Sequence, residues 1–421
     1  MNILVIGSGG REHAIVRKLK ESPKTGRLWC APGNGGIAAD AECVNIGAMD
    51  IDGVVRFAQE NPVDLVFVAP DDPLAAGMVD ALEAAGTRAF GPRANAAVIE
   101  GSKVFSKNLM KKYGIPTACY EVFSDPAEAV AYIEAEGKFP VVVKADGLAL
   151  GKGVIIAESL EAAKDAVRTI MEDKVFGASG NHIVVEEFLT GPEVSVLAFT
   201  DGKTLRPMVS SKDHKRALDG DRGLNTGGMG TISPNPYYTD EIAQTCMETI
   251  FLPTIRAMQA EGRPFKGCLY FGLMLTPDGP KVIEYNARFG DPETQVVLPR
   301  LKTDFVDILD AVIDERLDAL EIEWSADACA CVVMASGGYP QSYPKGIEIT
   351  GLDENGQVAG ATVYHAGTKR AGDKLVTNGG RVLGVTATAE TLDAALEKAY
   401  AAVEKIHFDG AHYRRDIGRT K

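Results

Sequence analysis

The sequence lacks several features that would place the protein in a membrane, in an oxidising compartment or on nucleic acid. No apolar run reaches the roughly 20 residues that cross a bilayer, and the first one, Ile3 to Ile6, stops at a glycine turn. The seven cysteines include no C-x-x-C pair, which predicts reduced thiols that mostly pack in the core. A net charge of −14 argues against nucleic acid or an anionic membrane as the main partner. We therefore expect a cytoplasmic protein whose anionic ligands are small and bound locally.

The first hundred residues alternate short apolar strands with helical stretches, including one at about 73–85. A strand from Asn2 to Ile6 leads through a glycine turn into a helix, whose free N–H groups suit an anion. The dinucleotide fingerprint G-x-G-x-x-G fails, because Glu12 stands where its third glycine belongs and the next strand lacks the acidic residue that would hold a ribose. The pattern therefore weakens the case for a nicotinamide oxidoreductase and predicts a small doubly wound α/β unit.

In the middle of the chain, D-P-A-E at 125–128 predicts a helix that runs to about residue 136, because a cap residue precedes a proline and a glutamate. Two apolar strands follow, 140–144 and 154–157, joined by a glycine-rich segment. The segment is not a Walker loop, because no Ser or Thr follows Lys152 and a strand rather than a helix comes next. It predicts a flap between antiparallel strands that folds its N–H groups over polyphosphate, with Lys144 as a fixed charge. The alternative is a surface hairpin with solvated lysines.

Two further stretches carry polar groups suited to a nucleotide and a zwitterion. A strand over 183–189 is followed by a turn and Glu193, whose carboxylate can accept hydrogen bonds from ribose hydroxyls. Residues 212–230 form a long polar, glycine-rich stretch with little periodicity, which predicts a functional loop. Within it, Asp213, Lys215 and Arg216 pair charges that can bind a carboxylate and an ammonium group.

The stretch from Val282 to Glu293 carries the most specific arrangement. As the returning strand of a hairpin, it alternates apolar residues with Glu284, Asn286 and Arg288 on the other face. A carboxylate, an amide oxygen and a guanidinium in a row suit a hard cation such as Mg²⁺ next to an anion. A half-exposed sheet face without function is the alternative when the row is taken alone.

Several motifs together resemble the ATP-grasp superfamily of carboxylate–amine ligases and, within it, the glycinamide ribonucleotide synthetase family. They are G-S-G-G-R-E-H-A (7–14), K-A-D-G-L-A-L-G-K-G-V (144–154), D-H-K-R-A-L-D-G-D (213–221), N-T-G-G-M-G (225–230), G-C-L-Y-F-G-L-M (267–274), N-A-R-F-G-D-P-E (286–293) and R-D-I-G (415–418). The resemblance implies a multidomain α/β and α+β fold. We expect an N-terminal doubly wound α/β domain (1–101), a central ATP-grasp of two α+β subdomains (102–325, with a mobile lid at about 120–190) and a small C-terminal α+β domain (326–421).

The resemblance also implies an activity. The family joins glycine to phosphoribosylamine through a glycyl phosphate intermediate in purine biosynthesis, giving glycinamide ribonucleotide, ADP and phosphate. The implied cofactors are ATP and Mg²⁺, with Mn²⁺ as an alternative. The implied partners are these small molecules, without nucleic acid or membrane, for a monomer or weak homodimer.

Residue roles follow by matching the motifs. Phosphate contacts are implied for Lys103, Lys144 and the flap residues Gly151, Lys152 and Gly153. Backbone contacts to adenine are implied for Glu186 and Leu189, and a ribose contact for Glu193. Glu284 and Asn286 would hold the metal, and Arg288 would neutralise charge on the transferred phosphoryl and acyl oxygens. The phosphoribosyl phosphate would lie at Gly9, Gly10 and Arg11, and glycine and its amine partner at Asp213 and Lys215, with Arg288.

Two departures from the family pattern qualify these roles. Many ATP-grasp enzymes carry a second acidic metal ligand on the neighbouring strand, where we expect Leu273 and Met274 opposite Glu284. Residues 69–74 read A-P-D-D-P-L instead of the family's glycine-proline-glutamate turn. We therefore expect one protein-held metal ion, and a smaller part for residues 69–74 in binding the substrate phosphate.

The last hundred residues predict a small α+β domain with a strand over 329–335 and a helix over 392–405. Cys329 and Cys331 share one strand face, which favours packing over metal binding. Arg414 and Arg415 are predicted to be surface cations.

Three alternatives to this ligase remain at this stage. One is an ATP-grasp ligase with a different acid and amine, such as a biotin-dependent carboxylase subunit. The others are the nicotinamide oxidoreductase and a non-catalytic nucleotide-binding module, which the row of Glu284, Asn286 and Arg288 opposes.

Overall fold

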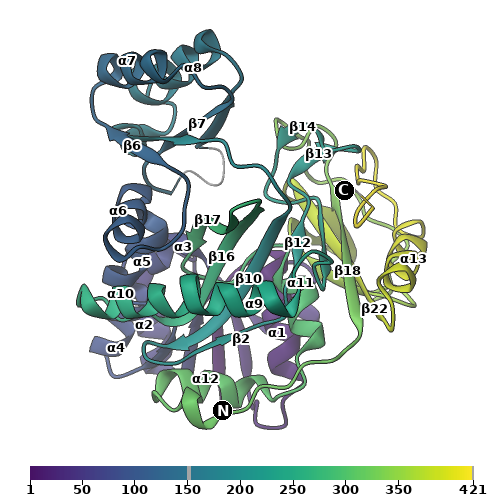
Figure 1. Ribbon diagram of the computed structural model, residues 1–421. Coiled ribbons are helices and arrows are strands. Elements are labelled where there is room, and N and C mark those ends of the chain that lie inside the picture. Colours follow the sequence, from purple (N-terminus) through teal and green to yellow (C-terminus); the bar gives the residue numbers. More distant parts are fainter. Residues whose placement is uncertain (149–152, 420–421) are drawn as a thin grey trace.

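The N-terminal part of the protein is a parallel five-stranded sheet with helices on both faces. The computed structural model describes residues 1–148 and 153–419 (Figure 1). The sheet has the order β3-β2-β1-β4-β5, and every pairing is parallel. Its elements are β1 (Ile3–Gly7), α1 (Gly10–Lys20), β2 (Leu28–Pro32), β3 (Glu42–Cys43), α2 (Ile51–Glu60), β4 (Leu65–Val68), α3 (Asp71–Ala75), α4 (Met78–Ala84), β5 (Arg88–Phe90) and α5 (Ala94–Gly101).

Strand β1 explains why this sheet is buried on both sides. Leu4 and Ile6 pack in the cluster that includes residues of α2 and α4, whereas Ile3 and Val5 pack with residues of α1. Continuous apolar strands of this kind are typical of parallel sheets covered by helices on both faces. The doubly wound α/β unit is therefore confirmed. The helix predicted over 73–85 is instead two helices, because Gly77 lies between them with a φ of 89°.

Helix α6 (Lys103–Tyr113) leads from this domain into a small lobe of two helices on a four-stranded sheet. The sheet order is β6-β9-β7-β8, all antiparallel. Asp125 caps the helix that follows β6 by accepting from the amides of Ala127 and Glu128, as its D-P-x-E sequence predicts. The elements are β6 (Tyr120–Phe123), α7 (Pro126–Glu136), β7 (Val141–Ala145), β8 (Val154–Ala157), α8 (Leu160–Val167) with a π-helical extension to Glu172, a 3-10 turn (Gly177–Gly180) and β9 (Ile183–Glu187).

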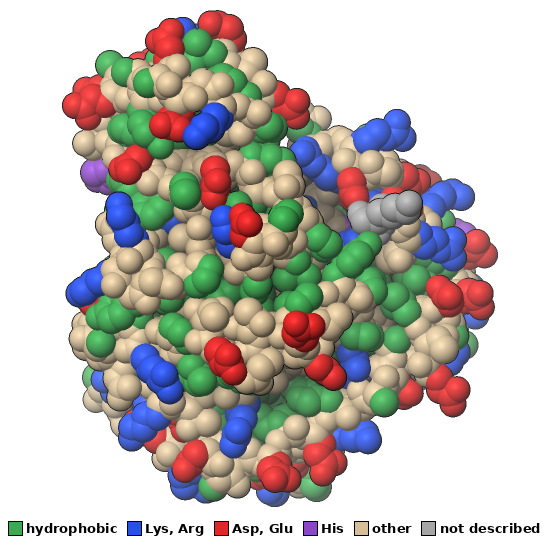
Figure 2. Space-filling model, viewed as in Figure 1, with side chains coloured by type: hydrophobic (Ala, Val, Ile, Leu, Met, Phe, Trp, Pro, Cys, Tyr) green, Lys and Arg blue, Asp and Glu red, His purple; other side chains and the backbone are tan. Residues whose placement is uncertain are grey.

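This lobe stands apart from the remainder of the molecule. Figure 1 places α7 and α8 at its outer end, and the molecular outline in Figure 2 is indented between the lobe and the C-terminal part. Its buried residues, among them Ile133, Val143 and Val185, form a separate hydrophobic cluster. The same view shows acidic and basic side chains interspersed over this face.

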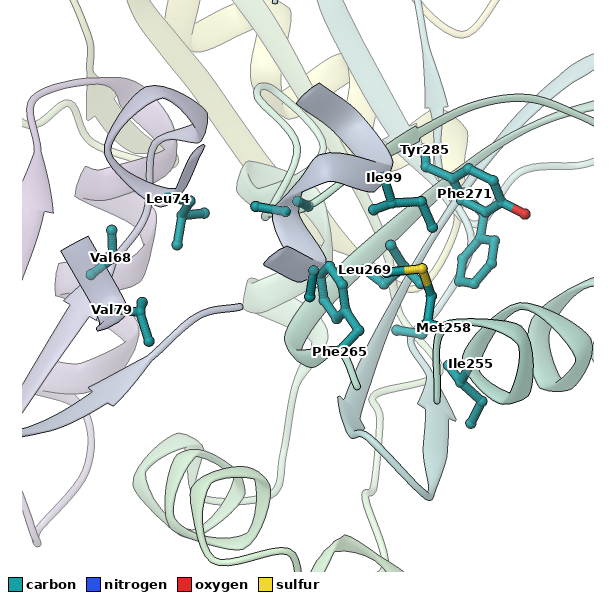
Figure 3. Packing of buried hydrophobic residues seen from close by; sticks show 14 of the residues in the cluster. Val68, Leu74, Val79, Ile99, Ile255, Met258, Phe265, Leu269, Phe271 and Tyr285 are labelled. Carbon is teal, nitrogen blue, oxygen red and sulfur yellow. The ribbon is translucent and has the colours of Figure 1, made fainter. Parts of the chain in front are cut away.

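The second sheet of the central region is antiparallel, with the order β11-β10-β16-β17. One face of this sheet packs against α9, α10 and the N-terminal domain in a single hydrophobic cluster. Val68, Leu74 and Val79 belong to the same core as Leu269 and Phe271 (Figure 3). The elements are β10 (Glu193–Asp201), β11 (Leu205–Pro207), α9 (Asp240–Cys246) with a π-helical extension to Phe251, α10 (Leu252–Ala260), β16 (Lys266–Thr276), β17 (Gly279–Asn286), α11 (Thr294–Val297), a 3-10 turn (Leu298–Arg300), α12 (Phe305–Ile313) and a 3-10 turn (Leu317–Ala319).

A third antiparallel sheet joins the C-terminal part to the segment 212–233. Its order is β12-β15-β18-β22-β19, with α13 packed on β18 and β22. The predicted loop over 212–230 is therefore wrong in part, because it contains short strands that pair with distant ones. The sheet and its helix consist of β12 (Lys212–Asp213), β15 (Gly230–Ser233), β18 (Ala328–Ala335), β19 (Thr362–His365), β22 (Arg381–Ala389) and α13 (Leu392–Val403). Two separate two-stranded sheets are formed by β13 (Arg216–Leu218) with β14 (Arg222–Asn225) and by β20 (Thr368–Ala371) with β21 (Lys374–Thr377).

Arg414 corrects the prediction of a surface cation. Its side chain has no exposed surface and forms ion pairs of 2.8 Å with Asp221 and Asp416, whereas Arg415 is exposed as predicted. A buried guanidinium needs such partners, because an unpaired charge in the interior is strongly destabilising. All seven cysteines are free thiols, and all but Cys43 and Cys119 are buried, as predicted. Within residues 1–148 and 153–419, no helix has the length and apolarity needed to cross a membrane.

Candidate active site

The predicted row lies along the end of β17. Tyr285, Ala287 and Phe289 are at most 3% exposed, so the apolar face is buried as the alternation predicts. Glu284 and Asn286 lie on the opposite, partly exposed face, and Arg288 follows two residues beyond the strand end. The sequence pattern therefore placed the three polar side chains on one side of the hairpin.

The strand opposite Glu284 differs from the prediction. Leu273 and Met274 pair with Val282 and Lys281, and Gly272 is the partner of Glu284, because the register shifts at Ile283, which has no partner on β16. A Cβ atom at position 272 would lie 3.1 Å from Cγ of Glu284. Glycine thus leaves room for the glutamate, and no carboxylate opposes it on β16.

Lys215 and the two acidic side chains Glu193 and Glu284 meet although they lie far apart in the sequence. Nζ of Lys215 lies 3.6 Å from Oε2 of Glu193 and 3.7 Å from Oε1 of Glu284. Glu193, and after it Glu284, raise the pKa of Lys215. Burial opposes ionisation of Glu284, but Lys215, Lys144 and Lys103 hold its pKa below the ordinary value. The structure thus brings five of the predicted site residues together, three of them cationic and two acidic.

Lys144 connects the lobe to this row. Its Nζ donates to the carbonyl oxygen of Ile283 at 3.2 Å and pairs with the buried carboxylate of Glu186. Lys107, which was not predicted, pairs with the same carboxylate at 2.5 Å. A spacing of four residues from Lys103 on a helix puts Lys107 on the same face, and this signal could have identified it.

The flap begins next to Lys103. The Nζ of Lys103 donates to the carbonyl oxygen of Gly147 at 2.9 Å, and burial lowers the pKa of this lysine. The amide of Ala145 donates to the carbonyl oxygen of Gly153 at 2.8 Å, which closes the hairpin between β7 and β8. Gly151 and Lys152 lie outside the described residues.

The two predicted adenine contacts lie at the end of β9, an inner strand between β6 and β7. Glu186 is the fourth residue of β9, and Leu189 follows the end of this strand and is partly buried. Glu193 is the first residue of β10 and is exposed. These positions place the predicted adenine and ribose contacts on consecutive strands that lead toward Glu284.

Asp213 lies at the start of the predicted glycine site. Its Oδ1 accepts from the amide of His214 at 2.7 Å, and burial followed by the charge of Glu293 raises its pKa well above the usual range. A Cβ atom at Gly228 would lie 2.6 Å from this Oδ1, so the N-T-G-G-M-G segment packs against the carboxylate. His214 accepts at Nε2 from the amide of Gly418 at 3.0 Å. This contact ties the segment to the C-terminal end of the chain.

The predicted phosphoribosyl site lies where α1 meets the end of the row. Arg11 pairs with Glu12 at 2.6 Å, and its guanidinium donates to the carbonyl oxygen of Phe289 at 3.1 Å. The amide of Gly9 donates to Oε2 of Glu12 at 2.6 Å. Gly10 lies against residue 295, because a Cβ atom added at Gly10 would approach the side-chain nitrogen of that glutamine to 2.7 Å.

Sequence reasoning missed several acidic and polar residues that complete this region. Glu100, Asp291, Glu293, Gln295 and Arg381 are all buried or partly buried. Asp291 and Glu293 belong to the motif at 286–293 but were given no role, and the other three lie outside the quoted motifs. Arg381 lies 3.4 Å from Asp291, and Gln295 donates to the same carboxylate at 2.7 Å. Glu100 pairs with Arg288 at 3.0 Å. Their positions depend on tertiary contacts that the local sequence does not encode.

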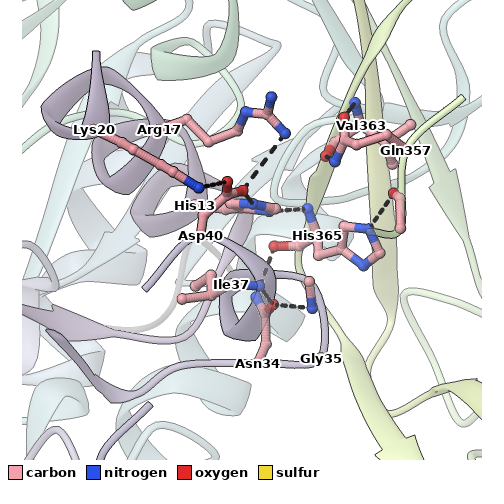
Figure 4. Close-up of polar contacts among 12 residues, drawn as sticks. His13, Arg17, Lys20, Asn34, Gly35, Ile37, Asp40, Gln357, Val363 and His365 are labelled. Carbon is pink, nitrogen blue, oxygen red and sulfur yellow. Dashed lines mark hydrogen bonds and ion pairs between the residues drawn. The ribbon is translucent and has the colours of Figure 1, made fainter. Parts of the chain in front are cut away.

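The N- and C-terminal domains meet behind this region through two histidines (Figure 4). His13 lies 3.0 Å from Asp40 through Nε2 and accepts at Nδ1 from the amide of His365 at 2.8 Å. Burial lowers the pKa of both imidazoles, that of His365 to about 3. Because Nδ1 of His13 accepts a hydrogen bond, the neutral imidazole fits this interface and holds α1 against β19.

The donors on β17 fit a hard divalent cation. Glu284 supplies a carboxylate, and the hydrogen-bonding surroundings of Asn286 turn its amide nitrogen toward Tyr285 O and Glu100 Oε1, so that its oxygen points away from them. In the described part of the chain, no group of three or more His, Cys, Asp or Glu side chains could hold a metal by itself. The remaining ligands would therefore be phosphate or water oxygens, as Mg²⁺ prefers.

Comparison with known proteins covers nearly the whole chain. The sequence matches three family models, described as the N domain (residues 1–100), the ATP-grasp (A) domain (101–294) and the C domain (329–420) of phosphoribosylglycinamide synthetase. It is 52% identical to a phosphoribosylamine–glycine ligase from Halalkalibacterium halodurans over 99% of this chain and 96% of that protein. It is 47% identical to a protein of the same name from Clostridium acetobutylicum over the full length of both.

Solved structures give the same result. A crystal structure of phosphoribosylamine–glycine ligase from Thermotoga maritima superposes with a TM-score of 0.88 at 34% identity, covering 99% of this chain and all of that one. A biotin carboxylase from Campylobacter jejuni superposes with a TM-score of 0.75 over 98% of this chain and 93% of that one, but at 14% identity. The second likeness concerns the fold alone.

Proposed function

Because the chain belongs to the phosphoribosylglycinamide synthetase family and is an ATP-grasp ligase, we propose that the site around Glu284 joins glycine to phosphoribosylamine. ATP is cleaved to ADP and phosphate, and glycinamide ribonucleotide is the product. The observation that carries this proposal is the meeting of Lys215 with Glu193 and Glu284. This ion-pair cluster brings together one residue each from the predicted nucleotide, metal and glycine contacts.

The nucleotide would lie between the lobe and β17. Lys103 and Lys144 supply charge for the phosphates, and the motifs assign phosphate contacts to Gly151, Lys152 and Gly153 as well. Backbone groups of Glu186 and Leu189 face adenine and Glu193 faces the ribose, which are the roles that the motifs predict. The separate hydrophobic cluster of the lobe supports its motion as a unit over the nucleotide.

A divalent cation bound at Glu284 and Asn286, either Mg²⁺ or Mn²⁺, would neutralise charge on the phosphate oxygens. Arg288 places a guanidinium at the end of the same row. Pre-positioned cations of this kind stabilise the charge that develops during phosphoryl transfer, because they need no reorganisation as the reaction proceeds.

The reaction would proceed in two steps. A carboxylate oxygen of glycine attacks the γ-phosphorus of ATP, and the bond to the bridging oxygen breaks with its electron pair leaving on ADP. The amine of phosphoribosylamine then attacks the carbonyl carbon of glycyl phosphate, the C–O bond to phosphate breaks, and the amine nitrogen loses a proton. Asp213 and Lys215 would bind the two ends of glycine, while Gly9, Gly10 and Arg11 hold the phosphoribosyl phosphate.

We also propose three domains, 1–101, 102–325 with a lid at about 120–190, and 326–421, in a protein of the cytoplasm. The separate cluster in the lobe and the reduced cysteines support these assignments. The sheet that joins 212–233 to 328–389 crosses the last boundary.

An omission experiment tests the function. The protein is supplied with ATP, Mg²⁺, glycine and freshly prepared phosphoribosylamine, and ADP release is measured with each component left out in turn. We expect release to require all four. Replacement of glycine and the amine by bicarbonate and biotin serves as the control for a carboxylase. ADP release that does not depend on glycine or on the amine would contradict the proposal.

A further inference from the structure

Glu100 lies outside every motif, yet its side chain is buried at the end of the predicted catalytic row. It is the penultimate residue of α5 and is only 8% exposed. A carboxylate withdrawn from water this far requires partners, because burial disfavours the charged form. All the partners found for it among the described residues come from one short segment, 286–288.

One carboxylate contacts three consecutive residues of that segment. Oε1 lies 3.0 Å from the guanidinium of Arg288 and accepts from the amide nitrogen of Asn286 at 2.9 Å. Oε2 accepts from the backbone amide of Ala287 at 2.6 Å. Glu100 therefore fixes both side chains and the backbone between them.

The contact decides which way the Asn286 amide faces. The nitrogen has two acceptors, Tyr285 O at 3.2 Å and Glu100 Oε1, so the oxygen is directed away from both. An amide nitrogen cannot bind a cation, whereas the oxygen can. Without the Glu100 carboxylate, the Asn286 nitrogen would keep only Tyr285 O as an acceptor, and the preference for this amide orientation would be weaker.

The Glu100 carboxylate also fixes the orientation of the Arg288 guanidinium. Its Nη2 atom faces Glu100, and its Nη1 atom donates to the carbonyl oxygen of Phe289 at 3.3 Å. The Nε atom is buried and has no hydrogen-bond partner within the described residues. Two of the three nitrogens are thus held, and the third is buried without a protein partner.

We propose that Glu100 is a positioning residue that turns the Asn286 oxygen and the Arg288 guanidinium toward the reacting phosphates. This inference rests on the proposed function, because it takes Asn286 as a cation ligand. Groups that orient a metal ligand in this way typically change metal affinity or activity by about 10- to 100-fold when removed. The competing explanation is a structural ion pair that only joins α5 to the end of β17.

The variant Glu100→Gln separates the two explanations. Binding of Mn²⁺ in the presence of a non-hydrolysable ATP analogue is measured by electron paramagnetic resonance, together with kcat, the KM for ATP and the thermal midpoint. We expect Mn²⁺ affinity to fall about tenfold and kcat to fall by about 100-fold, with a much smaller change in the KM for ATP. Wild-type Mn²⁺ affinity and kcat in this variant would overturn the inference.

Asp310→Asn is a control for the loss of a carboxylate away from the row. It removes one partner of an ion pair of 2.7 Å with Arg88, which is partly exposed and keeps Asp314 as a second partner, so we expect a small change in the thermal midpoint and unchanged Mn²⁺ affinity. A purely structural role for Glu100 predicts that Glu100→Gln lowers the thermal midpoint and, like Asp310→Asn, leaves Mn²⁺ affinity unchanged. This result would also overturn the inference.

The double variant Glu100→Gln/Asn286→Asp supplies a second test, which can be made even if the single variant Glu100→Gln does not fold. An aspartate at 286 has oxygens on both sides and needs no orientation, while the amide introduced at position 100 can donate to it. We expect this variant to bind Mn²⁺ more tightly than Asn286→Gln with Glu100 intact. Equal or weaker binding would contradict an orienting role.

Failure of the proposed function gives a different result. If the wild type binds no Mn²⁺ with the nucleotide analogue, Asn286 and Glu284 are not cation ligands, and both the function of this row and the inference fail. If the wild type binds Mn²⁺ and Glu100→Gln binds it equally well, the role of Glu100 alone is overturned.

Discussion

Nζ of Lys215 lies 3.7 Å from Oε1 of Glu284, although 68 residues separate the two in the sequence. This ion pair brings the segment 212–230 to the row for which we propose a metal ion. Lys215→Gln removes this charge with little change in length. We expect kcat to fall by about 100-fold or more, because a pre-positioned cation stabilises developing negative charge. The assay is ADP release under saturating substrates, with the thermal midpoint as a check on folding. Activity close to wild type would remove Lys215 from the site.

Glu284→Ala should abolish turnover while the fold stays intact. The carboxylate is one of only two oxygen donors that β17 offers to a cation, and no acidic residue opposes it on β16. Turnover and circular dichroism are measured side by side. Asp278→Ala, at the exposed turn of the same hairpin, is the control and should behave as wild type.

Removal of divalent cations should stop ADP release and leave the fold unchanged. In the proposed site, Glu284 and Asn286 hold the cation and the substrate or water supplies its other ligands, so chelation should empty it without unfolding the chain. Activity after EDTA treatment is compared with activity after return of Mg²⁺ or Mn²⁺. A large fall of the thermal midpoint in EDTA would point to a structural metal instead.

Glu186→Gln should destabilise the lobe strongly. The buried carboxylate pairs with Lys144 and Lys107, and its loss leaves two buried cations without a counter-charge, an effect of about 3–5 kcal/mol. Burial alone would raise the pKa of Glu186, but the two lysines hold it below its ordinary 4.5. The stabilisation is therefore present above about pH 4.5 and lost as the pH falls through the lower folded pKa. Proteolysis of the lobe at pH 7 and pH 4 measures both effects.

His214 should make the protein less stable in mild acid. Burial lowers its pKa to about 4, while an unfolded histidine titrates near 6.5. Below 6.5 the unfolded chain binds a proton that the folded imidazole does not, so stability falls by about 2 kcal/mol between pH 7 and pH 5. Urea unfolding at the two pH values measures the loss. His214→Gln should be less stable at pH 7 but show a smaller loss, whereas the exposed His407→Gln should keep the wild-type loss.

The sequence predicted those parts of the fold that depend on local patterns. The alternation along 282–289 placed Glu284 and Asn286 on one face, and the D-P-x-E sequence at 125–128 gave the start of α7. Both features need only the residues themselves, because side-chain period and capping are local properties.

Features that depend on tertiary contacts could not be predicted in this way. The register shift between Gly272 and Leu273, where β17 carries the extra residue Ile283, sets Gly272 opposite Glu284, and no local pattern marks it. The buried Arg414 pairs with Asp221, which lies nearly two hundred residues away, as well as with the neighbouring Asp416. Glu100 likewise acquires its partners from the strand end at 286–288. In each case the missing information is a contact between distant segments.

The sheet that unites 212–233 with 328–389 limits how this enzyme can be taken apart. Two of its strands, β12 and β15, come from the middle of the chain; β12 pairs with β15, and β15 pairs with β18. The C-terminal region therefore cannot be exchanged as a separate domain, because cutting it off would leave unpaired strand edges on both fragments. Chimeras between relatives should tolerate crossovers near residue 101 better than near residue 326. Gene fusions should preserve activity only when they carry the chain as one uninterrupted unit.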